Sequence, residues 1–336
     1  MNNIFKIDRS SRIYVVCPAN NKTGGTELLH QLANELAIKG LNAYVAYYLE
    51  GKCNRSEPTP EEFKKYKFNA CLIDEVIDNK ENIIVLPEVC IGKHRKYKNL
   101  QKCVWWLSVD NFKVMHGKFN RLKKYGLKSF IKHLFLMDYS KLNDITSINI
   151  HLYQSYFASN FLENVGISND HMFYLSDYIN DIYKNNFTSE NKEDIVIYNP
   201  KKGLEFTQKL ILFSKEIKWV PIINMSNEEV VELMKKAKVY IDFGNHPGKD
   251  RIPREAAISG CCVITNKSGS AAFAKDVPIP EAYKIEDKDE NITKIIHIIN
   301  NCIENYDLKI HEFDTYREFI SKEKDCFSRD VEYLFQ

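Results

Sequence analysis

The segment from His246 to Glu255 concentrates side chains that could bind an anionic ligand. It contains a histidine, three cations and two carboxylates around the pair Pro247-Gly248. Because the segment follows a short apolar run, we expect a loop at the end of a strand, and loops on rigid scaffolds commonly carry function. The residues that we expect to contact a ligand here are His246, Gly248, Lys249, Arg251, Arg254 and Glu255.

Glu255 has two interpretations at this position. Near the start of a helix its charge would complement the helix dipole, which contributes about 0.3–1 kcal/mol. Alternatively, its carboxylate would accept hydrogen bonds from hydroxyl groups of a ligand.

Two other loops carry glycine or lysine beside predicted strands. Thr23-Gly24-Gly25-Thr26 precedes a helix whose free N–H groups would bind an anion, so Gly24, Gly25 and Thr26 are candidates. Asn199-Pro200-Lys201-Lys202-Gly203 joins a strand to a helix, and Asn199, Lys201 and Lys202 would meet a diphosphate there. The simpler interpretations are a tight turn and two solvated lysines. The glycine spacing differs from Gly-x-Gly-x-x-Gly, which argues against a dinucleotide-dependent dehydrogenase.

Alternating strands and helices must position these loops. Apolar runs at Arg12 to Cys17 and Ala43 to Tyr48 are typical of buried strands, and Thr26 to Lys39 between them has the apolar spacing of a helix. A second series of this kind begins at Ile195 to Tyr198. We therefore predict an α/β fold with two Rossmann-like domains facing a central cleft. The predicted domains are residues 1–180 and 181–336, with the last helix packing back on the first domain.

The helices and strands of the second series can be predicted in more detail. Ser226 and Glu229 form a capping-box pattern at a helix start. The other expected elements are a helix over Leu204 to Phe213, strands over Trp219 to Ile223, Val239 to Phe243 and Cys261 to Thr265, and helices over Arg251 to Ser259 and Ile292 to Ile303.

Composition excludes several classes of protein. The chain has 336 residues and a net charge of +2, which argues against nucleic acid as a partner. Its nine cysteines form no Cys-x-x-Cys pair, so a zinc site is not indicated and a reducing cytoplasm is expected. No signal peptide or membrane-spanning run is predicted.

The stretch from Met225 to Ser270 resembles the donor-binding half of retaining glycosyltransferase family 4. The parts follow the family's order: a capped helix, a strand, a Pro-Gly loop, Arg254-Glu255-Ala256-Ala257-Ile258-Ser259-Gly260, another strand and the small-residue loop Ser268-Gly269-Ser270. The Gly24-Gly25 turn and the Asn199 to Gly203 turn are similar to the family's other two loops. The resemblance covers most of the chain and is loose between Glu50 and Leu152.

The resemblance implies a GT-B glycosyltransferase that holds a nucleotide-sugar donor mainly in its second domain. Glu255 matches the second glutamate of the family's glutamate pair and would contact the ribose, and Ser270 would lie in the donor site. Lys201 or Lys202 and the amide of Gly25 would meet the diphosphate. Asp110, after a strand at Val104, and Glu255 are the candidate catalytic residues, with Glu88 a weaker one. No metal or cofactor is expected, because no Asp-x-Asp stands where a metal-bound donor would need it.

The chain departs from the family pattern at three points. Pro247 stands where the first glutamate is expected, and Asn199 and Pro200 stand where an arginine is expected. The family's catalytic histidine has no clear match. Lys249, Arg251 or Arg254 would then supply the missing positive charge.

The segment from Lys118 to Lys141 alternates lysine or arginine with apolar residues. One interpretation is a helix with a solvated basic face. The other is docking to an anionic membrane surface, as a lipid-linked acceptor would require. The expected acceptor is a cell-envelope glycan or a lipid-linked glycan, and the expected location is the cytoplasm, at the inner membrane face.

Two alternative functions remain open from the residues alone. A sugar-nucleotide epimerase would share the architecture and act without an acceptor. A non-catalytic protein that binds nucleotide sugars or glycans would explain Pro247 at the first glutamate position.

Overall fold

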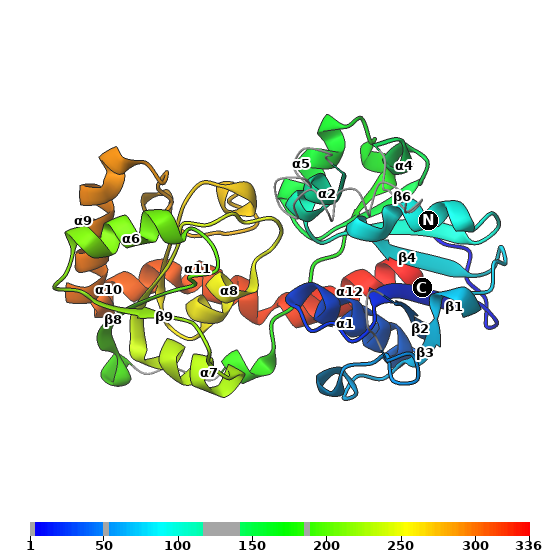
Figure 1. Cartoon of the computed structure of the whole chain (residues 1–336), viewed down its shortest axis with the longest axis horizontal. Helices are drawn as coiled ribbons and strands as arrows, with labels where there is room; N and C mark the ends of the chain where they lie inside the picture. The colour runs from blue at the N-terminus through cyan, green and yellow to red at the C-terminus, as the bar shows by residue number, and fades with distance from the viewer. Residues whose placement is uncertain (1–3, 50–53, 117–141, 185–188) are drawn as a thin grey trace. The chain divides into compact units, whose positions relative to one another are not determined.

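The computed structural model describes residues 4–49, 54–116, 142–184 and 189–336. The chain divides into two compact units (Figure 1), one of Met1–Asp177 with Asp325–Gln336 and one of Tyr178–Lys324. The sequence analysis placed the division after residue 180. In the structure it lies after Asp177, and the chain returns to the first unit at Asp325.

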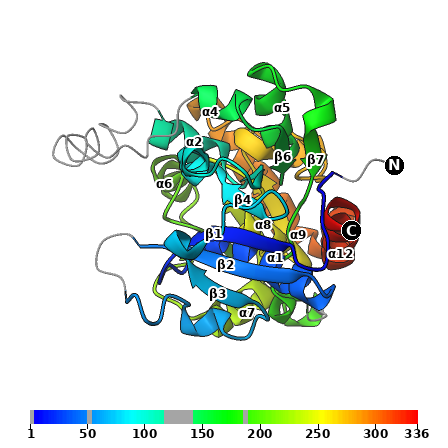
Figure 2. The ribbon, with the colours of Figure 1, turned by 90° about the vertical axis from the view of Figure 1, so that its right-hand side faces the viewer.

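The first unit is built on a parallel sheet with the strand order β3-β2-β1-β4-β5-β6-β7. Figure 2 shows β1, β2 and β3 side by side. The strands are β1 (Arg12–Pro18), β2 (Asn42–Tyr48), β3 (Asn69–Leu72), β4 (Ile83–Pro87), β5 (Gln101–Trp106), β6 (Ile150–Tyr153) and β7 (Met172–Tyr174). Its described helices include α1 (Gly24–Ile38), α2 (Val109–His116), α4 (Leu142–Thr146), α5 (Tyr156–Asn164) and the 3-10 helix η3 (Glu88–Lys96).

Burial explains which strands the sequence could indicate. The central strands β1 and β4 are buried along most of their length, so their β-branched runs stand out. The edge strands β3 and β7 were not predicted, because β3 is a half-exposed Asn-Ala-Cys-Leu and β7 has only three residues. The α/β class with parallel sheets is confirmed.

The last helix, α12 (Glu323–Phe335), contributes apolar side chains to the first unit. Phe335 stacks on Phe5 with ring centroids 5.0 Å apart, and Phe327 stacks on Trp105 at 6.5 Å. All four side chains are buried, so this return segment completes the core of the first unit.

The second unit has a smaller parallel sheet with the order β11-β10-β8-β9. Its strands are β8 (Glu193–Tyr198), β9 (Lys218–Pro221), β10 (Ala237–Asp242) and β11 (Cys262–Thr265). Its α-helices include α6 (Leu204–Phe213), α7 (Asn227–Lys236), α8 (Arg251–Ile258), α9 (Ile292–Glu304), α10 (Tyr306–Lys309) and α11 (Asp314–Ser321).

The predicted capping box at the start of α7 is confirmed. Ser226 Oγ accepts the amide of Glu229 at 3.2 Å, and Glu229 Oε2 accepts the amide of Ser226 at 2.6 Å. The two hydrogen bonds satisfy amides that the first helical turn cannot pair.

Within the described parts of the chain, no helix is both long and apolar enough to span a lipid bilayer. The basic segment from Lys118 to Lys141 lies outside the described residues.

Glu88 is a buried carboxyl group at the carboxyl end of β4. Its Oε2 accepts the amide of Leu107 at 3.0 Å, which fastens the start of η3 to the turn after β5. Burial raises the pKa of Glu88 to about 7, although hydrogen bonds from backbone amides oppose the shift. The carboxyl group therefore binds a proton more tightly in the folded chain than in the unfolded chain.

This shift predicts a pH-dependent contribution to stability that Glu88→Gln would remove. The folded pKa exceeds the unfolded one, so the contribution is full below about pH 4.5 and is lost as the pH rises through about 7. The free energy of unfolding of the wild type, relative to Glu88→Gln, should fall by roughly 2–3 kcal/mol from pH 4.5 to 8 in urea titrations. Glu163→Gln, at an exposed site on α5, is the control and should run parallel to the wild type. A difference between wild type and Glu88→Gln that stays constant over this range would contradict the prediction.

Candidate functional site

Three loops of the second unit lie at one edge of its sheet. Strands β8, β10 and β11 are neighbours and parallel, so the loops that follow them leave from the same edge. The predicted residues on these loops or on α8 are Asn199, Lys201, Lys202, His246, Gly248, Lys249, Arg251, Arg254, Glu255 and Ser270. The sheet topology therefore gathers them at its carboxyl edge, where ligands of open parallel sheets bind.

Two glycines allow the backbones of these loops to touch. Gly203 has φ +63°, and a Cβ atom there would lie 2.4 Å from the carbonyl group of Phe243. Gly269 has φ +56°, and a Cβ atom there would lie 1.9 Å from the carbonyl oxygen of His246. No other residue type fits either position, so the three loops form one rigid edge.

Ser270 joins the third loop to the second. Its amide donates to the carbonyl of His246 at 2.9 Å, and its Oγ donates to the carbonyl of Gly248 at 2.5 Å. Asn266 supports the same contact, because its Nδ2 donates to the carbonyl of Gly244 at 2.9 Å. Ser270 is fully buried, and in this structure its hydroxyl fixes the shape of the loop.

Asp242, His246 and Asp250 form a cluster, called here the Asp-His-Asp cluster, in which Asp242 and His246 are buried and Asp250 is partly buried. The ammonium of Lys202 lies 3.2 Å from Asp242 Oδ2 and 2.5 Å from Asp250 Oδ2. His246 Nδ1 lies 2.9 Å from the same oxygen of Asp250, and Tyr240 donates its hydroxyl to Asp242 Oδ2 at 2.8 Å. Lys202, which the sequence assigned to a diphosphate, thus has two carboxylate partners within the unit.

The charges of this cluster stabilise one another. Burial by itself would lower the pKa of Lys202, but the carboxylates of Asp250 and Asp242 outweigh it and raise that pKa. Burial would raise the pKa of Asp250, but His246 and Lys202 lower it below its usual value. Lys202 and Asp250 are therefore both charged at neutral pH.

Lys249 and Arg254 are paired with a residue that the sequence analysis did not select. Lys249 Nζ lies 2.9 Å from Glu323 Oε1, and Arg254 NH1 lies 2.8 Å from Glu323 Oε2. All three side chains are buried. Arg254 also donates to the backbone carbonyls of Asp250 and Lys249. These two cations hold the loop before α8 to the first residue of α12.

The other predicted residues differ in exposure. Lys201 is exposed, and its amide donates to Asn199 Oδ1 at 3.0 Å. Arg251 is half-buried in the first turn of α8, where its NH2 lies 3.4 Å from the carbonyl of Tyr178. Glu255 is 8% exposed and lies in the second turn of α8.

The remaining predicted residues belong to the first unit. Helix α1 begins at Gly24, after Thr23, which forms a capping box with Thr26. As at any helix start, the first-turn amides of Gly24 and Gly25 have no intrahelical acceptor. Asp110 follows the predicted strand. Strand β5 ends at Trp106, and Asp110 lies in the first turn of α2.

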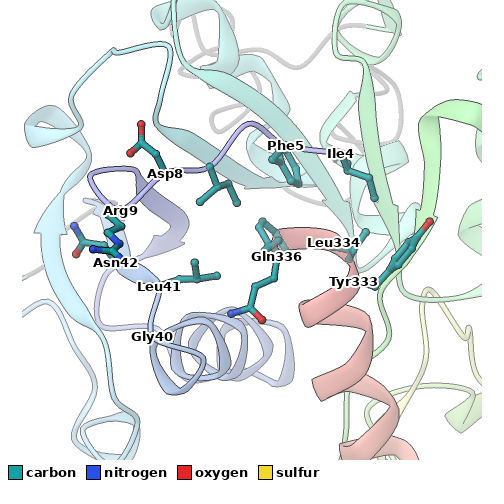
Figure 3. A pocket seen from close by; sticks show the side chains of 12 residues that line it. Ile4, Phe5, Asp8, Arg9, Gly40, Leu41, Asn42, Tyr333, Leu334 and Gln336 are labelled. Atoms are coloured by element: carbon teal, nitrogen blue, oxygen red, sulfur yellow. The ribbon is translucent and has the colours of Figure 1, made fainter. Parts of the chain in front are cut away.

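A pocket of about 600 Å³ in the first unit lies apart from these residues (Figure 3). It lies beside the amino ends of β1 and β2, where Arg9, Gly40 and Asn42 meet Leu334 and Gln336 of the return segment. Because ligands of parallel sheets bind at the opposite edge, we assign it no role in the site.

The sequence analysis missed the carboxylates Asp242, Asp250 and Glu323. Asp242, His246 and Asp250 follow one another at intervals of four residues, a regular pattern that was visible in the sequence. Glu323 lies far along the chain, and no local signal connects it with Lys249 or Arg254.

No protein-family model matches the chain, and no curated protein sequence matches it. Solved structures do match its fold. Sucrose-phosphate synthase from Thermosynechococcus elongatus superposes with a TM-score of 0.63 at 12% identity, over 97% of this chain and 98% of that chain. HepE from Anabaena, solved with UDP-glucose, gives 0.61 at 10% identity over 96% and 99%.

A third match is to a longer protein. TarM from S. aureus, in a variant solved with UDP, α-GlcNAc-glycerol and fondaparinux, gives a TM-score of 0.52 at 16% identity over 77% of this chain. The chain spans 56% of the length of TarM. The likeness to sucrose-phosphate synthase and HepE extends over nearly the whole of each chain. The protein therefore has the fold of the GT-B glycosyltransferases, with two Rossmann-like domains.

Proposed function

We propose that the protein transfers a sugar from a nucleotide-sugar donor to a cell-envelope glycan or lipid-linked acceptor. The observation that carries this proposal is the whole-chain likeness to HepE, whose solved complex contains UDP-glucose. The resemblance of Met225 to Ser270 to glycosyltransferase family 4 supports the same reaction and implies retention of configuration. The rigid loop edge of the second unit supplies a site of the required chemistry.

In this proposal the second unit binds the donor. Lys201 and Arg251 neutralise charge on the diphosphate, and Asn199 holds the turn that carries Lys201. The amides of Gly24 and Gly25 offer an anion-binding helix start on the first unit. We assign Lys249 and Arg254 to shaping the loop, because Glu323 balances both.

The reaction breaks the bond between the anomeric carbon and the diphosphate oxygen and forms a bond from that carbon to an acceptor hydroxyl oxygen. The hydroxyl proton leaves with the nucleoside diphosphate. Positive charge develops at the anomeric carbon, as in glycoside hydrolysis. Stabilising the departing diphosphate is then the main catalytic task, and Lys201 and Arg251 supply cations for it without a metal. Asp110 and Glu255 are the proposed catalytic residues.

Incubation with a panel of nucleotide sugars tests this proposal. Without an acceptor, we expect slow hydrolysis of one donor, with free sugar and nucleoside diphosphate detected by anion-exchange chromatography. This release of sugar and nucleoside diphosphate should continue in the presence of EDTA, because no metal ion is expected to take part. An epimerised nucleotide sugar would indicate an epimerase, and binding without any turnover, even with acceptor mixtures, would indicate a binding protein.

Glu255→Ala should weaken nucleotide binding. Loss of hydrogen bonds from ribose hydroxyls to a carboxylate costs about 1.5–3 kcal/mol, which corresponds to roughly a ten- to hundredfold higher Kd. Isothermal titration with the nucleoside diphosphate of the accepted donor measures this change.

The matched control is Glu304→Ala, at an exposed position at the end of α9 in the same unit. It removes the same side chain and should leave the Kd unchanged. If Glu255→Ala folds and binds the nucleotide as the wild type does, then the donor site lies elsewhere.

We also propose that the segment from Lys118 to Lys141 docks the protein on the anionic inner face of the membrane. Each lysine near such a surface contributes about 1 kcal/mol at most and is screened by salt. Lys123→Gln/Lys124→Gln/Lys128→Gln should reduce co-sedimentation with phosphatidylglycerol vesicles. The control Lys64→Gln/Lys65→Gln/Lys67→Gln removes three exposed charges elsewhere and should bind as the wild type does. Equal sedimentation with neutral and anionic vesicles would contradict the proposal.

A further inference from the structure

The Asp-His-Asp cluster has the composition of a metal site. Its three residues each offer one ligand atom, and these atoms all lie within 4.8 Å of one another. One nitrogen and two carboxylate oxygens are a ligand set that Zn²⁺ accepts, with water in a fourth position. Two ligand atoms of a tetrahedral Zn²⁺ ion lie about 3.4 Å apart, so the most distant pair would have to approach by up to about 1.4 Å on binding.

The cluster already holds a cation, which is the ammonium of Lys202. That ammonium lies within 3.2 Å of carboxylate oxygens from both aspartates. It also lies 3.4 Å from the carbonyl of Asn245. A positive group is therefore bound where a metal ion would sit.

The carboxylates of this cluster need a positive partner. The side chains of Asp242 and His246 are almost completely buried, where a carboxylate without a nearby cation is costly. The Lys202 ammonium supplies one positive charge to the two carboxylates, and a divalent ion in its place would supply two.

The fold also provides the route by which Lys202 reaches the cluster. A Cβ atom on Gly244 would lie 2.7 Å from Cβ and Cγ of Lys202, so the stem of the lysine passes directly over this glycine. Asp250 precedes α8 but makes no side-chain capping bond to it. Its Oδ2 instead lies 2.5 Å from Lys202. The path of the Lys202 side chain over Gly244 and the absence of a capping bond from Asp250 both leave these side chains to the binding of a cation.

We infer that the Asp-His-Asp cluster is a divalent-metal site that the chain occupies with its own lysine. The Lys202 ammonium and a Zn²⁺ ion compete for the carboxylates of Asp242 and Asp250. The wild type therefore binds Zn²⁺ weakly at this site, and removal of the ammonium makes it a strong site. This inference concerns metal binding alone and does not rest on the proposed transfer reaction.

The test is Zn²⁺ binding to Lys202→Ala, measured by competition with a chromophoric chelator. The expected result is one Zn²⁺ per chain, bound at least tenfold more tightly than by the wild type. Lys202→Ala/His246→Ala should lose that gain, because it lacks the nitrogen ligand. Co²⁺ in place of Zn²⁺ should give visible absorption bands of a tetrahedral site in Lys202→Ala only.

Lys201→Ala is the matched control, because it removes the neighbouring, exposed lysine and leaves the cluster intact. It should bind Zn²⁺ as the wild type does. Lys202→Gln, which is neutral but keeps most of the side chain, replaces Lys202→Ala if circular dichroism shows that the alanine variant is unfolded. The inference is overturned if neither variant exceeds the affinity of the wild type, or if the gain survives His246→Ala.

Discussion

The carboxylate of Asp242 is the interaction on which the candidate site depends. It ends the central strand β10, where Tyr240 donates to its Oδ2 and the amide of Gly244 donates to its Oδ1 at 3.1 Å. The Lys202 ammonium approaches from the turn after β8. One buried charge thus connects the turn after β8 and the loop after β10 to the end of β10. Because such a charge is stable only with its partners in place, the conformations of these loops are linked to one another.

A second group of buried charges, formed by Lys249, Arg254 and Glu323, fixes the other end of the loop before α8. Glu323 faces both Lys249 and Arg254, and breaking such a pair by removing one member typically costs about 3–5 kcal/mol. The loop before α8 is therefore held to Lys202 by the Asp-His-Asp cluster and, at its end, to Glu323. A ligand at this edge would meet a surface whose shape is already set, which lowers the entropy lost on binding.

The sequence predicted the elements whose signals are local. The helix Leu204–Phe213 and the capping box of Ser226 and Glu229 were predicted as they occur, because helical spacing and caps are written in adjacent residues. The half-exposed edge strand β3 was missed, since none of its residues is fully buried and it therefore lacks an apolar run. The three loops were correctly located at strand ends, and parallel topology then gathers them.

The partners of the cations could not be predicted in the same way. Glu323 is distant in sequence from Arg254, and only the folded chain brings them to 2.8 Å. Lys202, Lys249 and Arg254 were predicted to bind a ligand, but each is paired with a carboxylate inside the unit. Lys202 and Asp242 are similarly separated along the chain, so their contact is a property of the sheet order β10-β8.

The return of the chain at Asp325 has a consequence for the order of folding. The core of the first unit includes Phe327 and Phe335, which follow the whole of the second unit along the chain. The second unit, by contrast, is contiguous from Tyr178 to Lys324. During synthesis the rings of Phe5 and Trp105 lack their partners Phe335 and Phe327 until the second unit has been made. The first unit therefore completes its core only after the second unit has been synthesised.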